Sequence, residues 1–374
     1  PGDAAALDAI TDTLHPDDAI NIQFTSGTTG RPKGATLTHR NIVANMAQCE
    51  GIQNYDMVSD KDVIIGFLPF FHIYGMVVIM NMSLSMGATI ITMPRFDMVQ
   101  FLELIQTHKV TRTNLVPPVL VGLAKHPIID KYDLSSLTEL TSGAAPLGEE
   151  LALEVKARTG AGITQGYGMT ETSPVTHVRP NIDGVGKYSS VGPAIPNTKI
   201  KIVGVETGEP VGHNERGEVW MHGPQVMQGY LNRPDATAAT LDDEGWIHTG
   251  DIGYVDDEGW LYVVDRRKEL IKYKGFQVAP AEMEALLLTH PAVADAAVIP
   301  SPDEEAGEVP KAFLVLKGET SEQSVMDWVA ERVAPHKKIR RVEFVSEIPK
   351  SLSGKILRRI LVEQEREKLG HCAP

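Results

Sequence analysis

Residues Thr25–Gly34 bring glycines, hydroxyl side chains and one lysine together within ten positions. Glycines let the backbone turn tightly, so that its N–H groups can approach an anion closely. The hydroxyls donate further hydrogen bonds, and Lys33 adds a point charge. This chemistry suits a polyphosphate, although short Gly/Thr-rich stretches are more often plain surface loops. The spacing is not that of a Walker A loop, because Pro32 occupies the place of its second glycine and Gly34 follows the lysine.

Several later segments also carry residues that could act on a nucleotide. Gln165–Glu171 combines an aromatic ring, a hydroxyl and a carboxylate, and Mg²⁺ prefers one or two carboxylates plus phosphates and water. Outside that context, such a glutamate would more often be a helix N-terminal charge. Asp251 could accept hydrogen bonds from two hydroxyls, whereas an aspartate in Asp-Ile-Gly is usually a turn residue. A Ser-Gly-Lys such as that ending at Lys355 is weak evidence by itself.

Residues Lys268–Gln277 concentrate three lysines in an acidic protein. Lys272 and Lys274 have the alternate spacing that predicts one face of a strand. The interpretation that requires no binding site is a solvated edge strand, in which lysine side chains oppose aggregation.

Composition excludes several classes of partner. The formal net charge is −14 and no basic tail or stripe is present, so nucleic acid and anionic membranes are poor candidates. Two cysteines far apart in the sequence argue against a disulfide framework or a metal cluster and favour a reducing, cytoplasmic location. Val63–Pro94 lacks charged residues, but Pro69, Gly75 and Gly87 interrupt it, whereas a membrane span needs about 20 mostly apolar residues in a row. We expect strand, loop, buried helix and strand there.

Strand and helix patterns alternate between Gly87 and Gly168, which predicts a parallel sheet with helices on its faces. The expected strands are 88–93, 110–116 and 137–141, and the expected helices are 98–108, 117 to about 126, and 148–158. Ligands bind such sheets at the carboxyl ends of the strands. The loops Thr141–Leu147 and Gln165–Glu171 are therefore the expected place of a site.

The pattern changes after Ser190 to short strands with turn residues, which predicts a β-rich subdomain over about 190–265. Asp265–Lys268 marks a plausible boundary. Beyond it we expect a small α+β domain over 266–374, with strands at 270–273, 294–299, 312–316 and 341–345 and helices at 280–289 and 321–333. The large domain would then be 1–265, with a hinge near 266–268.

Taken together, the segments resemble the adenylate-forming (AMP-binding) superfamily, which contains acyl-CoA synthetases, firefly luciferase and peptide-synthetase adenylation domains. The resemblance runs in the right order over nearly the whole chain. It is closest to the 4-coumarate–CoA ligases, through Phe-His-Ile-Tyr (71–74), Val-Pro-Pro-Val (116–119), Ser-Gly-Ala-Ala-Pro-Leu-Gly (142–148) and Leu-Ile-Lys-Tyr-Lys-Gly-Phe-Gln-Val-Ala-Pro-Ala-Glu (270–282). Family members normally carry a long segment before the phosphate loop, so we expect the first part of the large domain to be missing here.

The resemblance implies a role for each matching residue. Lys355 would be the mobile catalytic lysine, with Thr170, Glu171 and Lys272 also catalytic and Glu171 the Mg²⁺ ligand. The residues implied to bind ATP or AMP are Thr25, Ser26, Gly27, Thr28, Thr29, Lys33, Gly143, Ala144, Gln165, Gly166, Tyr167, Thr170, Asp251, Arg266, Lys268, Lys272 and Gln277. Those implied to line the carboxylate substrate are His72, Tyr74, Val78, Gly143 and Val175. Those implied to bind coenzyme A are Arg95, Lys274 and Gly275.

The implied activity is a two-step ligation. A carboxylic acid attacks Mg·ATP to give acyl-AMP and pyrophosphate, and coenzyme A then displaces AMP. Departures from the plant enzymes at Gly217–Gly223, Thr176 and Val78 leave hydroxycinnamate, another aryl acid and a medium-chain fatty acid open as the substrate. The alternatives are an adenylating enzyme with another acceptor, by transfer to a carrier protein or luciferase-like oxidation, and a catalytically inactive fragment.

Overall fold

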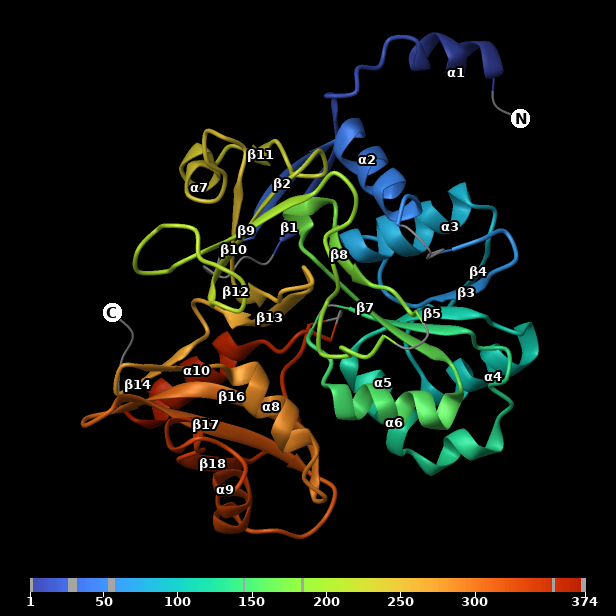
Figure 1. The fold of residues 1–374 in the computed structure, drawn as a ribbon. Coiled ribbons are helices and arrows are strands. Elements are labelled where there is room, and N and C mark those ends of the chain that lie inside the picture. Colours follow the sequence, from blue (N-terminus) through green and yellow to red (C-terminus); the bar gives the residue numbers. More distant parts are fainter. Residues whose placement is uncertain are drawn as a thin grey trace.

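A six-stranded sheet extends from the middle to the right-hand side of the molecule in Figure 1. The computed structural model describes residues 3–25, 32–52, 58–143, 145–182, 185–351 and 354–370. The strand order is β4-β3-β5-β6-β7-β8, parallel except for β8, which is antiparallel to β7. The strands are β3 (Val63–Gly66), β4 (Thr89–Thr92), β5 (Arg112–Leu115), β6 (Glu139–Ser142), β7 (Gly162–Gly168) and β8 (Val175–Arg179).

Helices connect these strands and cover the sheet. They are α4 (Met98–His108), α5 (Pro117–Lys125) and α6 (Glu149–Thr159), with the 3₁₀ turn η2 (Pro127–Lys131) after α5. Helix α4 buries Phe101, Leu102 and Ile105, the spacing of a helix with one apolar face. Helix α5 begins at Pro117, whose fixed φ suits a first helical turn. Helix α6 ends before Gly160, which has a φ of +74°.

The charge-free segment 63–94 folds as expected. Strand β3 is followed by a loop, the π-helix η1 (Tyr74–Asn81), the short helix α3 (Met82–Ser85) and strand β4. Within the described ranges, none of the helices combines the length and apolar character that crossing a bilayer requires.

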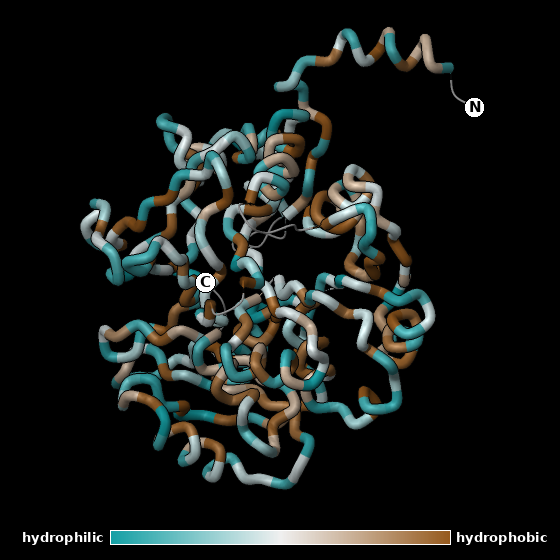
Figure 2. Tube along the Cα trace, turned by 45° about the vertical axis from the view of Figure 1, so that its right-hand side comes forward, coloured by the Kyte–Doolittle hydropathy of each residue, from teal (hydrophilic) through white to brown (hydrophobic). Residues whose placement is uncertain are grey.

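A smaller sheet holds both ends of the Gly/Thr-rich segment Thr25–Gly34. It consists of β1 (Ala19–Thr25), β2 (Lys33–Thr38) and β11 (Gly229–Tyr230) in that order, flanked by α2 (His39–Glu50) and α7 (Pro234–Ala238). A capping box between Thr38 and Asn41 begins α2. Helix α1 (Ala4–Thr11) buries no residue and stands apart from the body (Figures 1 and 2).

An antiparallel sheet of order β13-β12-β10-β9 occupies the stretch expected to be β-rich. Its strands are β9 (Lys199–Val203), β10 (Gly217–His222), β12 (Ile247–Val255) and β13 (Leu261–Arg266). Cross-strand pairing places Asp251 of β12 directly opposite Arg266 of β13. Two residues far apart in sequence are thereby brought to one edge of the sheet.

The C-terminal part of the chain gathers around a separate sheet, below the others in Figure 1. The order is β15-β14-β17-β16, with β18 parallel to β17. These strands are β14 (Ile271–Tyr273), β15 (Phe276–Val278), β16 (Val293–Asp303), β17 (Gly307–Leu316) and β18 (Arg341–Phe344). The helices are α8 (Pro280–Leu288), α9 (Glu322–Ala330) and α10 (Arg358–Lys368), with the 3₁₀ turn η4 (Pro335–Lys337).

Two details differ from the expectations. Gln165 and Tyr167 lie within β7 rather than in a loop after it, because pairing with β8 extends that strand to Gly168. Lys274 does not share a strand face with Lys272. Strand β14 ends at Tyr273, and Lys274 lies in the hairpin turn with a φ of +46°.

Candidate active site

Tyr167, Asp251 and Arg266 form a connected group from three strands. The Tyr167 hydroxyl donates a 2.5 Å hydrogen bond to Oδ2 of Asp251, and Nε of Arg266 lies 3.4 Å from Oδ1 of the same carboxylate. Burial raises the pKa of Asp251, while the charge of Arg266 and the Tyr167 hydrogen bond oppose that rise. The group offers an aromatic ring, a carboxylate and a guanidinium, which suit a base and two ribose hydroxyls.

A second group joins Lys33, Glu171 and Tyr230. The Tyr230 hydroxyl donates a 2.6 Å hydrogen bond to Oε1 of Glu171, and Nζ of Lys33 lies 4.0 Å from the centroid of the Tyr230 ring. Burial lowers the pKa of Lys33, and the nearby Glu171 carboxylate opposes that effect. Lys33 lies on β2 and Glu171 in the 3₁₀ turn η3 (Thr170–Thr172), so tertiary contacts bring this cation and this carboxylate to the same tyrosine.

Lys355 reaches the first group from the far end of the chain. Its pKa is lowered to about 8, chiefly by burial and also by the charge of Arg266, while the charges of Glu269 and Asp251 oppose the change. Burial and the charge of Lys355 also lower the pKa of His72. One ammonium is therefore electrostatically coupled both to Asp251 and to a residue of the expected acid pocket.

The expected acid-pocket residues meet around Tyr74. Its hydroxyl donates to Oδ1 of Asn114 at 2.9 Å. A Cβ added at Gly143 would lie 2.9 to 3.1 Å from the Tyr74 ring, so this glycine makes room for the aromatic side chain. Val78 and Val175 belong to the apolar cluster against which Tyr74 packs.

The structure leaves several expected residues away from these groups. Lys272 and Gln277 face each other on the β14–β15 hairpin and are exposed. Lys274 pairs with Glu305, and Arg95 is exposed in the loop after β4. Gly275 lies in the turn of the same hairpin, with a φ of +84°.

The remaining expected residues divide into three sets. Gln165 is buried, and its side-chain amide holds the neighbouring loop through Leu147 and Tyr188. Gly166 pairs with Val178 inside the sheet. Thr170 is the first residue of η3, and Thr25 is the last residue of β1. Lys268 is exposed, and its charge lowers the pKa of Lys33. Ser26, Gly27, Thr28, Thr29 and Ala144 lie outside the described residues.

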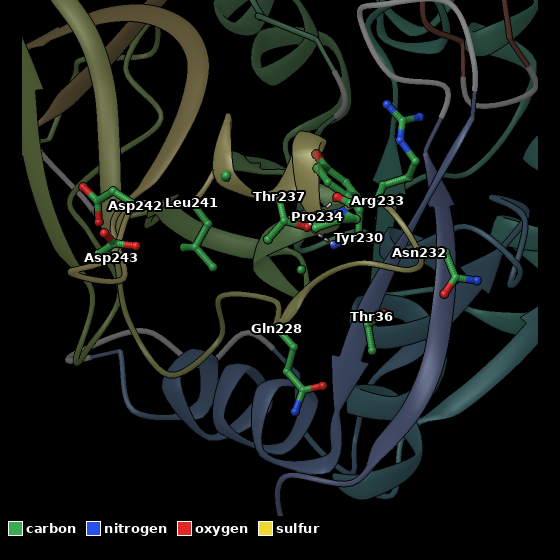
Figure 3. Close-up of a pocket in the computed structure, with 12 residues that line it drawn as sticks. Thr36, Gln228, Tyr230, Asn232, Arg233, Pro234, Thr237, Leu241, Asp242 and Asp243 are labelled. Atoms are coloured by element: carbon green, nitrogen blue, oxygen red, sulfur yellow. Dashed lines mark hydrogen bonds between the residues drawn. The ribbon is translucent and has the colours of Figure 1, made fainter.

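Sequence patterns did not reveal Tyr230. It follows a glycine in a two-residue strand, where no periodicity marks it. A shallow depression of about 600 Å³ lies beside it, between β2, β11 and α7 (Figure 3). Tyr230 lines that depression, but none of the expected site residues does. The depression therefore adjoins the second group only through Tyr230.

Comparison with known proteins decides the family. The AMP-binding enzyme family matches residues 2–231, and the AMP-binding enzyme C-terminal domain matches residues 282–355. The chain belongs to the AMP-binding enzymes. The family expected from the motifs is thus confirmed, and so is its fold: a large α/β part with a parallel sheet and a smaller C-terminal part. The limits 1–265 and 266–374 and the hinge remain predictions.

Relatives of this AMP-binding enzyme include 4-coumarate–CoA ligases. The Pinus taeda enzyme is 49% identical over 354 residues, which cover 93% of this chain and 66% of the relative. Enzyme 2 of Nicotiana tabacum is 49% identical over 355 residues, with the same coverage. The chain thus spans a little under two thirds of the length of these relatives.

Solved structures of similar fold include complexes with nucleotides. ATP-bound MatB from Rhodopseudomonas palustris matches with a TM-score of 0.84 and 31% identity, covering 95% of this chain and 70% of MatB. The o-succinylbenzoate CoA synthetase MenE from Bacillus subtilis, in complex with its acyl-adenylate intermediate, matches with a TM-score of 0.81 and 33% identity, covering 93% of this chain and 70% of MenE.

Proposed function

We propose that the protein is an ATP-dependent carboxylate–CoA ligase that works through an acyl-AMP intermediate. The observation that carries the proposal is the coupling of Lys355 both to Asp251, in the nucleotide group, and to His72, beside the acid pocket. Attack of a carboxylate on a phosphate brings two anions together, and a fixed cation between them lowers the barrier. With a pKa of about 8, Lys355 is mostly protonated at neutral pH.

In the first step, a carboxylate oxygen of the acid attacks the α-phosphorus of ATP. A carboxyl O–P bond forms, the bond between the α-phosphorus and its bridging oxygen breaks, and pyrophosphate leaves with the bond electrons. Lys355 neutralises the two approaching anions, and Thr170 donates a hydrogen bond to the α-phosphate. Lys33 and the phosphate loop bind the departing pyrophosphate. Tyr167, Asp251 and Arg266 bind the adenosine, supported by their mutual contacts.

Glu171 fits a role as a magnesium ligand. It is only 6% exposed, and one of its oxygens accepts the Tyr230 hydroxyl. Among the described residues no group of three His, Cys, Asp or Glu side chains could hold a metal, so one carboxylate with phosphates and water would have to suffice, as is usual for Mg²⁺. When bound, the ion neutralises phosphate charge.

In the second step, the thiolate of coenzyme A attacks the acyl carbonyl. A C–S bond forms, the C–O bond to AMP breaks, and AMP leaves. We propose that the C-terminal part rotates near Lys268 to bring Lys272, Lys274 and Gly275 to the site, with Arg95 contacting coenzyme A. The outward position of Lys272 and the pairing of Lys274 with Glu305 support a second arrangement for this hairpin.

We propose a hydroxycinnamate or related aryl acid as the substrate. Its support is the 49% identity to proteins named 4-coumarate–CoA ligases. The apolar cluster of Val78 and Val175, against which Tyr74 packs, supports an acid with an apolar body, and a medium-chain fatty acid is the second candidate.

The test uses the natural full-length protein with ATP, Mg²⁺ and a panel of acids: 4-coumarate, benzoate and octanoate. We expect acid-dependent exchange of pyrophosphate into ATP without coenzyme A, and thioester formation when it is added. Exchange without any thioester would favour the other acceptors, a carrier protein or oxidation. No acid-dependent exchange with any of these acids would contradict the proposal.

A further inference from the structure

Arg358 is held by two carboxylates at the base of the segment that carries Lys355. Its Nε donates to Oε1 of Glu284 at 3.2 Å, its Nη2 donates to Oε2 of the same residue, and its Nη1 donates to Glu269. The side chain is 14% exposed, and those of Glu269 and Glu284 are 22% and 9% exposed. One guanidinium thus joins α10, α8 and the segment just after β13.

The helix alone does not explain why Arg358 is buried at this position. Arg358 is the first residue of α10, where the helix dipole disfavours a cation, and no acidic residue lies in that first turn. The next residue, Arg359, is 67% exposed, and its ion pair among the described residues is with Glu363 on its own helix. Two adjacent arginines therefore differ in burial, and the carboxylates of Glu269 and Glu284 explain why Arg358 is the buried one.

Arg358 directly follows a turn around Lys355, which hydrogen bonds between its described residues close. The Ser351 N–H donates to the Lys355 carbonyl at 2.8 Å, and the Lys355 N–H donates to the Ser351 hydroxyl at 3.1 Å. The Leu357 N–H donates to the Pro349 carbonyl at 2.9 Å. Because the turn is closed on itself, fixing Arg358 also fixes the direction in which Lys355 leaves it.

The contact with Glu269 connects this turn to the expected hinge. Glu269 follows Lys268, and its N–H donates to the Arg266 carbonyl at 2.9 Å. The neighbouring Asp265 accepts a 2.8 Å hydrogen bond from the N–H of Ala281, near the beginning of α8. The same few residues therefore adjoin the nucleotide group through Arg266 and the Lys355 turn through Arg358.

We propose that Arg358, held between Glu269 and Glu284, is a positioning residue that aims Lys355 at the reacting carboxylate and phosphate. The inference rests on the proposed function. A further consequence is electrostatic: positive Arg358 lowers the pKa of Lys355, and negative Glu269 raises it. The charged or titratable groups that face Lys355 are Asp251 on β12, Arg266 on β13, Glu269 after it, Arg358 on α10, and His72 before η1.

The competing explanation is an ion cluster that only stabilises the fold. Breaking a buried pair by removing one partner is destabilising in either case, so loss of stability cannot separate the two. The two explanations can be separated because Arg358 and Glu269 act in opposite directions on the pKa of Lys355. General damage would lower activity at all pH values, whereas altered charge moves the alkaline limb of the activity profile.

The experiment compares Arg358→Gln, Glu269→Gln and the control Arg359→Gln in the natural full-length protein. Acid-dependent pyrophosphate exchange is followed from neutral to alkaline pH, with the unfolding temperature and thioester formation from supplied acyl-AMP measured in parallel. Lys355→Arg tests whether deprotonation of Lys355 causes the alkaline limb. Because arginine stays protonated, the loss of activity at alkaline pH should disappear in this variant.

Glu269→Gln should move the alkaline limb of the activity profile to lower pH, and Arg358→Gln should move it to higher pH. We expect each shift to be about half a pH unit or more. Arg358→Gln should also lower the exchange kcat about tenfold or more through misaligned Lys355, with thioester formation from acyl-AMP changed much less. Arg359→Gln should match the wild type. If Arg358→Gln does not fold, Glu269→Gln decides alone.

Shifts in the same direction, or no shift in Glu269→Gln, would overturn the inference. Equal loss in both half-reactions for a folded Arg358→Gln protein would do the same. Failure of the wild type to exchange pyrophosphate would instead refute the proposed function, so the two failures are distinguishable.

Discussion

The hydroxyl of Tyr230 donates a 2.6 Å hydrogen bond to Glu171, and the ring of the same tyrosine carries the Lys33 ammonium on its face, 4.0 Å from the centroid. One side chain thereby fixes both the carboxylate proposed for Mg²⁺ and the lysine proposed for the departing phosphates. Both charged groups therefore contact a residue that neither the spacing nor the motifs identified.

Removing the Tyr230 hydroxyl should therefore weaken the binding of Mg·ATP. Tyr230→Phe keeps the ring and its contact with Lys33 but loses a hydrogen bond to a charged group, about 1.5 to 3 kcal/mol, so we expect KM for Mg·ATP to rise about tenfold or more. Steady-state kinetics at varied Mg·ATP would check this. Tyr262→Phe is the matched control, because its hydroxyl contacts Asp256 at 3.4 Å. An unchanged KM in Tyr230→Phe would refute the role.

The Tyr167–Asp251 hydrogen bond predicts a pH effect. The bond lowers the pKa of Asp251 against the larger effect of burial, so Tyr167→Phe should raise that pKa further. In the proposed site the ionised carboxylate accepts hydrogen bonds from the ribose hydroxyls, and it becomes protonated as the pH falls through its pKa. ATP binding should therefore fail at a higher pH in Tyr167→Phe than in the wild type, while binding above that range stays similar. Calorimetric titration of ATP at several acidic pH values measures this, and coincident profiles would count against it.

Gly143 predicts the shape of the acid pocket. Its replacement by alanine brings a Cβ within 2.9 to 3.1 Å of the Tyr74 ring, which must move. Gly143→Ala should lower kcat/KM for bulky aryl acids about tenfold, roughly the effect of one or two methylenes in an apolar pocket, and affect small acids less. Gly148→Ala is the control, since its Cβ would meet nothing within 4 Å. Equal losses for large and small acids would argue that Tyr74 does not border the substrate.

Much of the fold could be predicted because local patterns determine it. Phe101, Leu102 and Ile105 mark α4 by their spacing, and Pro117 marks the start of α5. Local patterns failed where contacts with residues distant in sequence determine where a strand begins or ends. Strand β7 extends through Tyr167 because β8 pairs with it, and Lys274 leaves its strand because the β14–β15 hairpin turns there.

The candidate site shows the same division. Lys33, Glu171 and Lys355 were candidates because the segments around them resemble motifs of the family. Tyr230 and Arg358 were not, since each acts through a contact with a residue at least 59 positions away. Such residues carry no periodic or motif signal of their own, and only the packed structure brings them to their partners.

The core makes a stability prediction that separates packing from helix propensity. Leu102 on α4 is fully buried, and Leu153 on α6 is 45% exposed. Leu102→Ala should destabilise the protein by about 2 to 5 kcal/mol through lost burial and a cavity, and Leu153→Ala by much less. Urea unfolding followed by circular dichroism measures both. Similar midpoints for the two variants would contradict the assignment of Leu102 to the core.

Lys355 provides the most direct test of the whole account. Lys355→Ala in the natural full-length protein is assayed with 4-coumarate for pyrophosphate exchange into ATP, and with supplied coumaroyl-AMP for thioester formation. The account predicts that exchange falls at least about 100-fold, as when a positioned electrostatic group is lost from an active site, while thioester formation stays within a few-fold of the wild type. Equal losses in the two half-reactions, or exchange that survives without Lys355, would contradict it.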